Sequence, residues 1–202
     1  MIKKIKFIFD LDGTVTAEET LPVIAHHFNI EAEIDEITRE TVQGNIPFVE
    51  SFIRRVGILG QLPVSEIAEL LANVRLYPHL FEFIRQHAEN CVIATGNLEC
   101  WVEKLIQKIG CTAFCSDAIV ENNKVVKLTK ILRKEVVVND LQKQGFSVVY
   151  IGDGNNDMEA MRSADIAIAA GLTHSPSKSL IPITDYLIFN EKALCRQLNQ
   201  LL

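Results

Sequence analysis

The chain has 202 residues, of which 48% are hydrophobic and 23% are charged. This length suits one mid-sized domain or one core with a modest insertion, and the apolar fraction excludes a disordered chain. The formal net charge of −6 argues against a general nucleic-acid binder, although a local basic pocket could still hold an anionic ligand.

The cysteines and the lengths of the apolar runs indicate in which cellular compartment the protein is expected. The five Cys form no CxxC pair and have no His cluster near them, so reduced thiols are expected and a structural zinc site is not. The apolar run that follows Met1 ends at Asp10, too soon for an export segment, and no run reaches the length of a membrane span. We expect a cytoplasmic protein that binds neither nucleic acid nor membrane; its oligomeric state stays open.

The predicted elements alternate between strands and helices, with one interruption. A buried strand over 5–9 comes first, and apolar residues between 18 and 74 then recur at helical spacing, which predicts three or four helices. From about 77 the alternation resumes. We predict, in chain order, a helix over 79–88, a strand over 91–95, a helix over 98–109, a short strand over 112–115, a hairpin over 118–128, a helix over 131–143, a strand over 147–151, a helix over 155–163, strands over 166–169 and 185–189, and a helix over 191–202.

Strands that alternate with helices predict an α/β fold, a Rossmann-like parallel sheet with helices on both faces. The helical block after the first strand breaks this alternation. We interpret it as a cap inserted beside the sheet. The expected domains are therefore a core of residues 1–16 plus 76–202 and a small helical cap of residues 17–75.

Three predicted strands end in polar groups at equivalent positions. The strand over 5–9 ends at Asp10, the strand over 91–95 ends at Thr95, and the strand over 147–151 ends at Gly152-Asp153. Ligands of an open parallel sheet bind outside the carboxyl ends of its strands, so these groups converge if the three strands are neighbours. One polar residue at a strand end is ordinary, but three at equivalent positions indicate a site.

Four carboxylates belong to this set: Asp10, Asp12, Asp153 and Asp157. Carboxylates in one pocket repel each other unless a cation compensates, and hard oxygen ligands around a small polar site favour Mg²⁺. For one Asp alone, a turn or helix-cap role is an equal alternative. For the whole set, the alternative is a phospho-acceptor receiver module, and the long helical insertion argues against it.

These segments resemble the motifs of the haloacid dehalogenase (HAD) superfamily, and the place of the insertion resembles its C1 cap type. Within that type the cap is similar to that of the phosphoserine phosphatase family. The motifs are Phe9-Asp-Leu-Asp-Gly-Thr14, Thr95, a lysine and Gly152-Asp-Gly-Asn-Asn-Asp157; the cap segments are Glu18-Glu-Thr-Leu, Ile37-Thr-Arg-Glu-Thr-Val-Gln-Gly44 and Ser51-Phe-Ile-Arg-Arg-Val56.

The resemblance implies a HAD-type fold and a Mg²⁺-dependent phosphatase that forms an aspartyl phosphate. Asp10 is then the nucleophile, Asp12 the general acid and base, and Thr95 a ligand of the phosphoryl group. The implied metal residues are Asp10, Asp12 through its carbonyl, and Asp153, with Asp157 orienting that shell. The family lysine neutralises phosphoryl oxygens; among Lys127, Lys130 and Lys134, we favour Lys134 at a predicted helix start.

The resemblance also implies a small phosphorylated metabolite as substrate, with O-phosphoserine as the first choice. Glu19 and Arg55 match positions that recognise the amine and the carboxylate, and both could instead be exposed helix charges. Gly96 and Asn156 match positions at the phosphate end of the site. Arg54 points to a different helix face than Arg55.

Two departures from the family pattern keep other substrates open. The second motif reads Thr95-Gly96-Asn97 where the phosphoserine phosphatase family has Ser-Gly-Gly, and the segment over 118–134 is shorter. The alternatives are a phosphatase for another small phosphomonoester, such as a methionine-salvage intermediate or a sugar phosphate, and a phosphotransferase that uses the same intermediate. The five His show neither metal spacing nor a nucleophile partner, so we expect them at the surface or partly packed.

Overall fold

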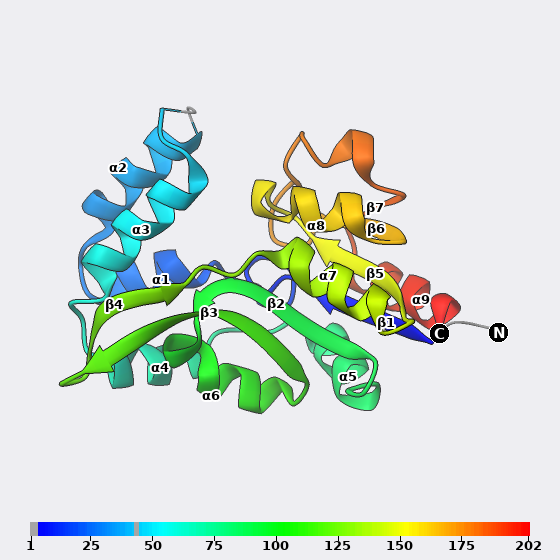
Figure 1. Cartoon of the computed structure of the whole chain (residues 1–202), viewed down its shortest axis with the longest axis horizontal. Helices are drawn as coiled ribbons and strands as arrows, with labels where there is room; N and C mark the ends of the chain where they lie inside the picture. Colours follow the sequence, from blue (N-terminus) through cyan, green and yellow to red (C-terminus); the bar gives the residue numbers. More distant parts are fainter. Residues whose placement is uncertain (1–3, 43–44) are drawn as a thin grey trace.

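The computed structural model describes residues 4–42 and 45–202 (Figure 1). The first three residues, and Gln43 and Gly44 at the end of one cap motif, lie outside the described residues. Within the described ranges, strands form a single sheet in the order β4-β3-β2-β1-β5-β6-β7. They are β1 (Ile5–Phe9), β2 (Cys91–Leu98), β3 (Thr112–Glu121), β4 (Lys124–Lys130), β5 (Ser147–Gly152), β6 (Ile166–Ala170) and β7 (Tyr186–Ile188).

All neighbouring strands pair in parallel except β3 and β4, which form an antiparallel hairpin. The prediction of an α/β fold with a mostly parallel sheet is therefore confirmed. β1 lies between β2 and β5, so the chain turns to opposite sides of β1 and creates the crevice where open α/β sheets bind ligands. Phe9 is level with Ile93 and Ile151, which brings the polar ends of these three strands to the same edge.

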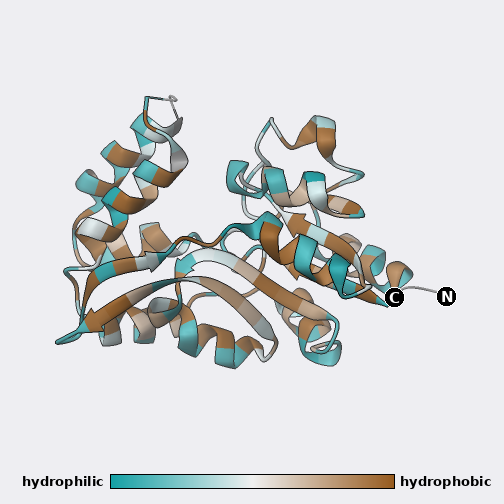
Figure 2. Cartoon of the chain, in the orientation of Figure 1, coloured by the Kyte–Doolittle hydropathy of each residue, from teal (hydrophilic) through white to brown (hydrophobic). Residues whose placement is uncertain are grey.

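Helices cover both faces of the sheet (Figure 1). One face carries α7 (Lys134–Lys143) and α8 (Met158–Ser163); the other carries α5 (Pro78–Gln86), α6 (Glu99–Ile109) and α9 (Glu191–Leu201). Phe7 and Phe9 pack into the second layer and Ile8 into the first, as the period-two geometry of a strand requires. Figure 2 shows the consequence: the strands are largely hydrophobic and the helices alternate between hydrophobic and hydrophilic faces.

The cap region contains four helices within the described residues, as predicted. They are α1 (Thr20–His27), α2 (Glu31–Val42), α3 (Phe48–Leu59) and α4 (Val64–Ala72). α2 and α3 stand as a pair beside the sheet, whereas α4 packs along α6 (Figure 1). The chain enters and leaves this region through adjacent segments, because Thr16 pairs with Leu76. The exact domain limits stay a prediction.

The hairpin of β3 and β4 is longer than predicted and is tied to α4. The predicted break near 116 is absent because Ser116 still pairs with Leu98 of β2 and Asp117 already pairs with Lys130 of β4. At the hairpin turn, Asn123 accepts the Val64 N–H on its carbonyl and the Ser65 N–H on Oδ1, both at 2.9 Å. It thus caps α4, whose preceding residue is a proline without a side-chain acceptor.

Two further boundaries differ from prediction by about three residues. β2 continues past Thr95 to Leu98, with an irregular register after Ala94, and α7 begins at Lys134. A short 3₁₀ turn, Asn155–Asp157, precedes α8, and another covers Ile181–Ile183. No helix in the described part of the chain is long and apolar enough to cross a membrane.

Candidate active site

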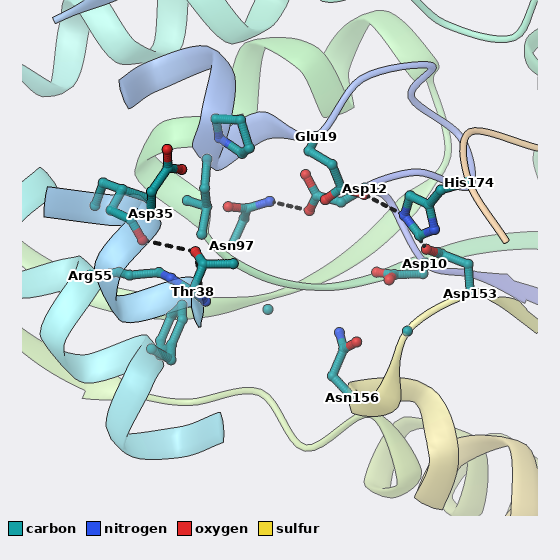
Figure 3. Close-up of a pocket in the computed structure, with 16 residues that line it drawn as sticks. Asp10, Asp12, Glu19, Asp35, Thr38, Arg55, Asn97, Asp153, Asn156 and His174 are labelled. Atoms are coloured by element: carbon teal, nitrogen blue, oxygen red, sulfur yellow. Dashed lines mark hydrogen bonds and ion pairs between the residues drawn. The ribbon is translucent and has the colours of Figure 1, made fainter. Parts of the chain in front are cut away.

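A cavity of about 410 Å³ opens at the carboxyl edge of the sheet, between the core and the cap (Figure 3). Figure 3 places Asp10, Asp153 and His174 on one side of this cavity and Arg55 on the other, with Asp12 and Asn97 between them. The sequence-predicted residues that line it are Asp10, Asp12, Glu19, Arg55, Gly96, Asp153 and Asn156. Lys134 and Asp157 lie directly behind Asp10.

Asp10 follows the last residue of β1 and is 4% exposed. Its N–H donates to the Ile151 carbonyl at 2.8 Å, which fixes the backbone to β5. Its Oδ1 accepts the Leu11 N–H at 2.8 Å and lies 2.6 Å from Lys134 Nζ. Burial raises the pKa of Asp10 well above its usual range, Asp157 raises it further, and Lys134 opposes both.

Lys134 begins α7 and is almost completely buried. Its Nζ contacts Asp10 Oδ1 at 2.6 Å and Asp157 Oδ1 at 2.7 Å. Burial lowers the pKa of Lys134, but the two carboxylates raise it by more, so the ammonium keeps its charge. Lys127 and Lys130 are exposed on β4. Of the three candidate lysines, Lys134 is the one that reaches Asp10.

Asp157 organises the loop between β5 and α8. Its Oδ1 accepts from Lys134 and from the buried Tyr150 hydroxyl, both at 2.7 Å. Its Oδ2 accepts the N–H groups of Asp153 at 3.0 Å and Gly154 at 2.9 Å. A Cβ at position 152 would lie 2.5 Å from this carboxylate, so only Gly152 fits here. Since both oxygens of Asp157 are occupied, the carboxylate positions its neighbours.

Asp12 lies two residues beyond Asp10 and is held on both oxygens. The Thr20 N–H donates to Oδ1 at 2.8 Å, and Asn97 Nδ2 donates to Oδ2 at 2.6 Å. Burial raises the pKa of Asp12, and the hydrogen bonds from Thr20 oppose that rise. A raised pKa suits a carboxyl group that must carry a proton near neutral pH.

Thr95 precedes Gly96 of the cavity wall and is fully buried. Its Oγ1 accepts the Asn97 N–H at 3.1 Å. Gly96 follows it on the cavity wall, where a Cβ would meet no atom within 4 Å. The backbone there is therefore open to a ligand.

The cap supplies the other wall of the cavity. Glu19 precedes α1, and burial together with the nearby Asp12 raises its pKa. Arg55 on α3 donates from Nη2 to Thr38 Oγ1 at 3.0 Å, and its Nε is buried without a hydrogen-bond partner among the described residues. Arg54 turns away and pairs with Glu50. Arg55 thus lines the cavity and keeps a donor that no described residue uses.

His174 lines the cavity, although the sequence predicts only a surface or partly packed position for it. Its Nε2 lies 2.9 Å from Glu19 Oε1 and 3.1 Å from Asp153 Oδ2. The hydrogen bond with Asp153 is the main reason that the pKa of His174 rises to about 10. Thr173 Oγ1 donates to the Gly13 carbonyl at 2.9 Å, which fixes the loop. The residue lies in a loop without a motif, so no sequence signal marked it.

The buried donors of this site fit a Mg²⁺ ion. Carboxylate oxygens of Asp10, Asp153 and Asp157 lie within 4.8 Å of one another. Asp157 is saturated by four hydrogen bonds, which leaves Asp10 and Asp153 as carboxylate ligands. Thr14 Oγ1 donates to Asp153 Oδ1 at 2.8 Å and orients it. Lys134 offsets one negative charge of these three carboxylates, and hard oxygen donors with residual charge suit Mg²⁺.

Acidic side chains and a buried lysine thus meet at the switch point of a mostly parallel sheet, the place where enzymes of open α/β folds bind their ligands. A family model described as haloacid dehalogenase-like hydrolase matches residues 7–162. The chain belongs to this family.

Two relatives agree with this family, and one solved structure agrees with the fold. Over 180 residues the chain is 26% identical to a phosphoserine phosphatase of Methanocaldococcus jannaschii, an alignment that covers 83% of this chain and 85% of the relative. A phosphoserine phosphatase of Wolinella succinogenes is 28% identical over 165 residues, or 74% of this chain and 79% of that protein. The fold is similar to a substrate-bound phosphoserine phosphatase, with a TM-score of 0.82 and 23% identity over the whole of both chains.

Proposed function

We propose that this protein is a Mg²⁺-dependent phosphomonoesterase that forms an aspartyl phosphate on Asp10 and hydrolyses O-phosphoserine. One observation carries the proposal. A buried carboxylate, Asp10, contacts Lys134 at 2.6 Å in a cavity that also holds Asp12 and, on the cap side, Arg55. The names of the relatives supply the substrate class, and the chain covers most of the length of the two relatives described above.

In the first half of the reaction an Asp10 oxygen attacks phosphorus while the ester P–O bond breaks. The leaving oxygen takes the proton of Asp12, which becomes a carboxylate. In the second half Asp12 takes a proton from water, the water oxygen attacks phosphorus, and phosphate leaves Asp10. Thr95, Lys134 and Asn156 donate to the phosphoryl oxygens throughout.

The carboxylates of Asp10 and Asp153 and the carbonyl of Asp12 would hold Mg²⁺. When bound, this ion supplies positive charge next to the phosphoryl oxygens. Asp157 keeps the loop that carries Asp153 in place.

In the proposed substrate complex, Arg55 binds the carboxylate and Glu19 the amine of phosphoserine. The unpartnered Nε of Arg55 and its position on the cavity wall support the first role. A guanidinium group matches a carboxylate in shape and charge. A small phosphorylated metabolite is thus the proposed partner, and a cytoplasmic location is the proposed setting.

The pairing of His174 with Glu19 favours a second candidate, a small phosphomonoester without an amine. The imidazole already occupies one oxygen of Glu19 at 2.9 Å, so a substrate ammonium has to displace or share that contact. A sugar phosphate or a methionine-salvage intermediate would not need this exchange.

Phosphate release from a panel of phosphomonoesters tests the substrate, with Arg55→Ala compared against Arg54→Ala. We expect O-phosphoserine to rank first. Arg55→Ala should lower its kcat/KM at least about tenfold, since a charge-assisted hydrogen bond is lost, and should leave p-nitrophenyl phosphate within about twofold. Arg54→Ala should change neither. Equal losses on both substrates in Arg55→Ala would remove Arg55 from substrate recognition, and a higher rank for an amine-free ester would favour the second candidate.

Asp10→Asn tests the nucleophile, with the exposed Asp140→Asn as the matched control. The amide cannot form the acyl phosphate, so turnover should fall by at least about three orders of magnitude while the thermal unfolding midpoint stays similar. Asp140→Asn should keep full turnover. A folded Asp10→Asn protein with turnover near the unmodified level would rule out this intermediate.

A further inference from the structure

Asn97 lies where the cap, the Asp12 carboxyl and the Thr95 hydroxyl meet. It lies near the end of β2, is 5% exposed and lines the cavity. Its Nδ2 is 2.6 Å from Asp12 Oδ2, 3.0 Å from Thr20 Oγ1 and 3.4 Å from Thr95 Oγ1. The two hydrogens of this amide therefore join the Asp12 carboxyl to the Thr20 hydroxyl at the start of α1. The related phosphoserine phosphatase motif has a glycine here and lacks this amide.

The contact with Asp12 fixes the plane of its carboxyl group. The Thr20 N–H holds Oδ1 and Asn97 holds Oδ2, so rotation about the Cβ–Cγ bond would break a hydrogen bond at each oxygen. Each carboxyl oxygen has two acceptor sites, so each keeps one that these donors do not use. The proton of the acid can thus reside on a site of fixed direction. An amide nitrogen next to a carboxylate oxygen also stabilises the charge left after the proton departs.

The contact between Asn97 and Thr95 bears on a second proton, that of the Thr95 hydroxyl. Thr95 Oγ1 receives the main-chain N–H of Asn97 at 3.1 Å and lies 3.4 Å from Nδ2. The two hydrogens of Nδ2 serve the shorter contacts with Asp12 and Thr20, so the main-chain N–H is the donor to Thr95. A hydroxyl has two acceptor sites and one donor, so accepting this N–H leaves the O–H of Thr95 free to donate elsewhere. In the proposed reaction the phosphoryl oxygen receives it.

We propose that Asn97 is a positioning residue for proton donation to the leaving group. This inference rests on the proposed function. The Asp10–phosphorus bond forms and the ester P–O bond breaks; its electron pair goes to the leaving oxygen, which takes the proton that Asp12 carries. Asn97 acts through Asp12 by holding that proton toward the leaving oxygen.

Leaving-group dependence tests the proposal, because only a poor leaving group needs the proton. A simple alkyl phosphate expels a strongly basic alkoxide, whereas p-nitrophenyl phosphate expels a stable anion. The measured quantity is kcat/KM, which ends at alcohol release and excludes the second half-reaction. Asn97→Ala should lower kcat/KM at least about tenfold for the alkyl ester and less than about threefold for the aryl ester, a share of the 10²–10⁴-fold that general acids contribute. Asp12→Ala, which removes the proton donor itself, gives the full loss of kcat/KM as a reference.

Asn73→Ala is the matched control, since Asn73 lies at the exposed end of α4 and should leave both values unchanged. The ratio of the two kcat/KM values does not depend on the folded fraction of the sample. If Asn97→Ala yields no folded protein, Asn97→Gly removes the same amide and is measured instead. Equal losses on both esters would overturn the positioning role. If the unmodified protein releases phosphate in Mg²⁺ neither from these two esters nor from O-phosphoserine, the proposed function itself fails.

Discussion

Lys134 shows how much depends on one side chain in this site. It is 4% exposed and contacts Asp10 and Asp157 at once, so its removal would leave two buried carboxylates without their cation. Removal of one partner from a buried charge cluster strongly lowers the free energy of unfolding, because the remaining charge stays desolvated without a counter-charge.

We therefore expect Lys134→Met to lower the free energy of unfolding by about 3–5 kcal/mol and to abolish phosphatase activity. Lys130→Met, at an exposed position of β4, should change the free energy of unfolding by no more than about 0.5 kcal/mol. Urea unfolding of the metal-free proteins measures both. Similar stability in the two variants would contradict the buried triad of Asp10, Lys134 and Asp157.

Site residues that directly follow a strand could be predicted from the sequence. Asp10 and Asp153 follow apolar runs, and parallel pairing brings such ends to one edge, so their proximity required no knowledge of loops. His174 could not be found in this way, because its contact with Glu19 depends on the path of the loop after β6. Tyr150, whose hydroxyl donates to Asp157, could not be identified either, because it lies within an apolar run where an aromatic residue is ordinary.

At the scale of elements, α4 is the helix that joins the cap region to the core. The hairpin turn supplies its cap through Asn123, and α6 packs along its length. Hydrophobic spacing predicted the existence of this helix correctly. It could not predict the cap, since the acceptor lies 58 residues away in the chain from Ser65.

Asn123→Gly should lower the free energy of unfolding by about 1 kcal/mol more than Asn122→Gly, because only Asn123 loses side-chain hydrogen bonds to Ser65 of α4. Both residues have positive φ angles, 63° and 49°, so glycine fits each backbone equally well. Chemical denaturation with a common baseline compares the two variants. Equal effects would mean that the main-chain carbonyl of Asn123 caps α4 without help from its side chain.

At the scale of the whole molecule, the net charge is −6, and five carboxylate side chains line the cavity together with one arginine. Burial is the main cause of the raised pKa of Asp10, so protons and Mg²⁺ compete for this carboxylate in the folded protein. Proton binding wins as the pH falls toward that raised pKa. The affinity for Mg²⁺ should therefore decrease with decreasing pH.

Mg²⁺ at about one hundred times its Kd should stabilise the protein by about 2.7 kcal/mol, or raise Tm by about 5–10 °C for a chain of this size. EDTA should reverse the shift, and at a fixed Mg²⁺ concentration the shift should be larger at pH 7.5 than at pH 5.5. Asp153→Asn should lose most of it, and Asp140→Asn should keep it. A Tm that does not respond to Mg²⁺ at either pH would exclude this set of ligands.

Asp10, the proposed nucleophile, contacts Lys134 and lies close to Asp153 and Asp157, so this acidic centre joins three stretches of chain: the end of β1, the start of α7 and the loop after β5. No fragment that stops before residue 134 contains the ammonium group, and none that stops before 153 contains the second carboxylate that is proposed to hold Mg²⁺. Turnover is consequently a reporter of complete assembly. During refolding, a chain longer than about 150 residues commonly passes through intermediates with native-like secondary structure, so catalysis should return only with the last of these segments, later than the helical signal.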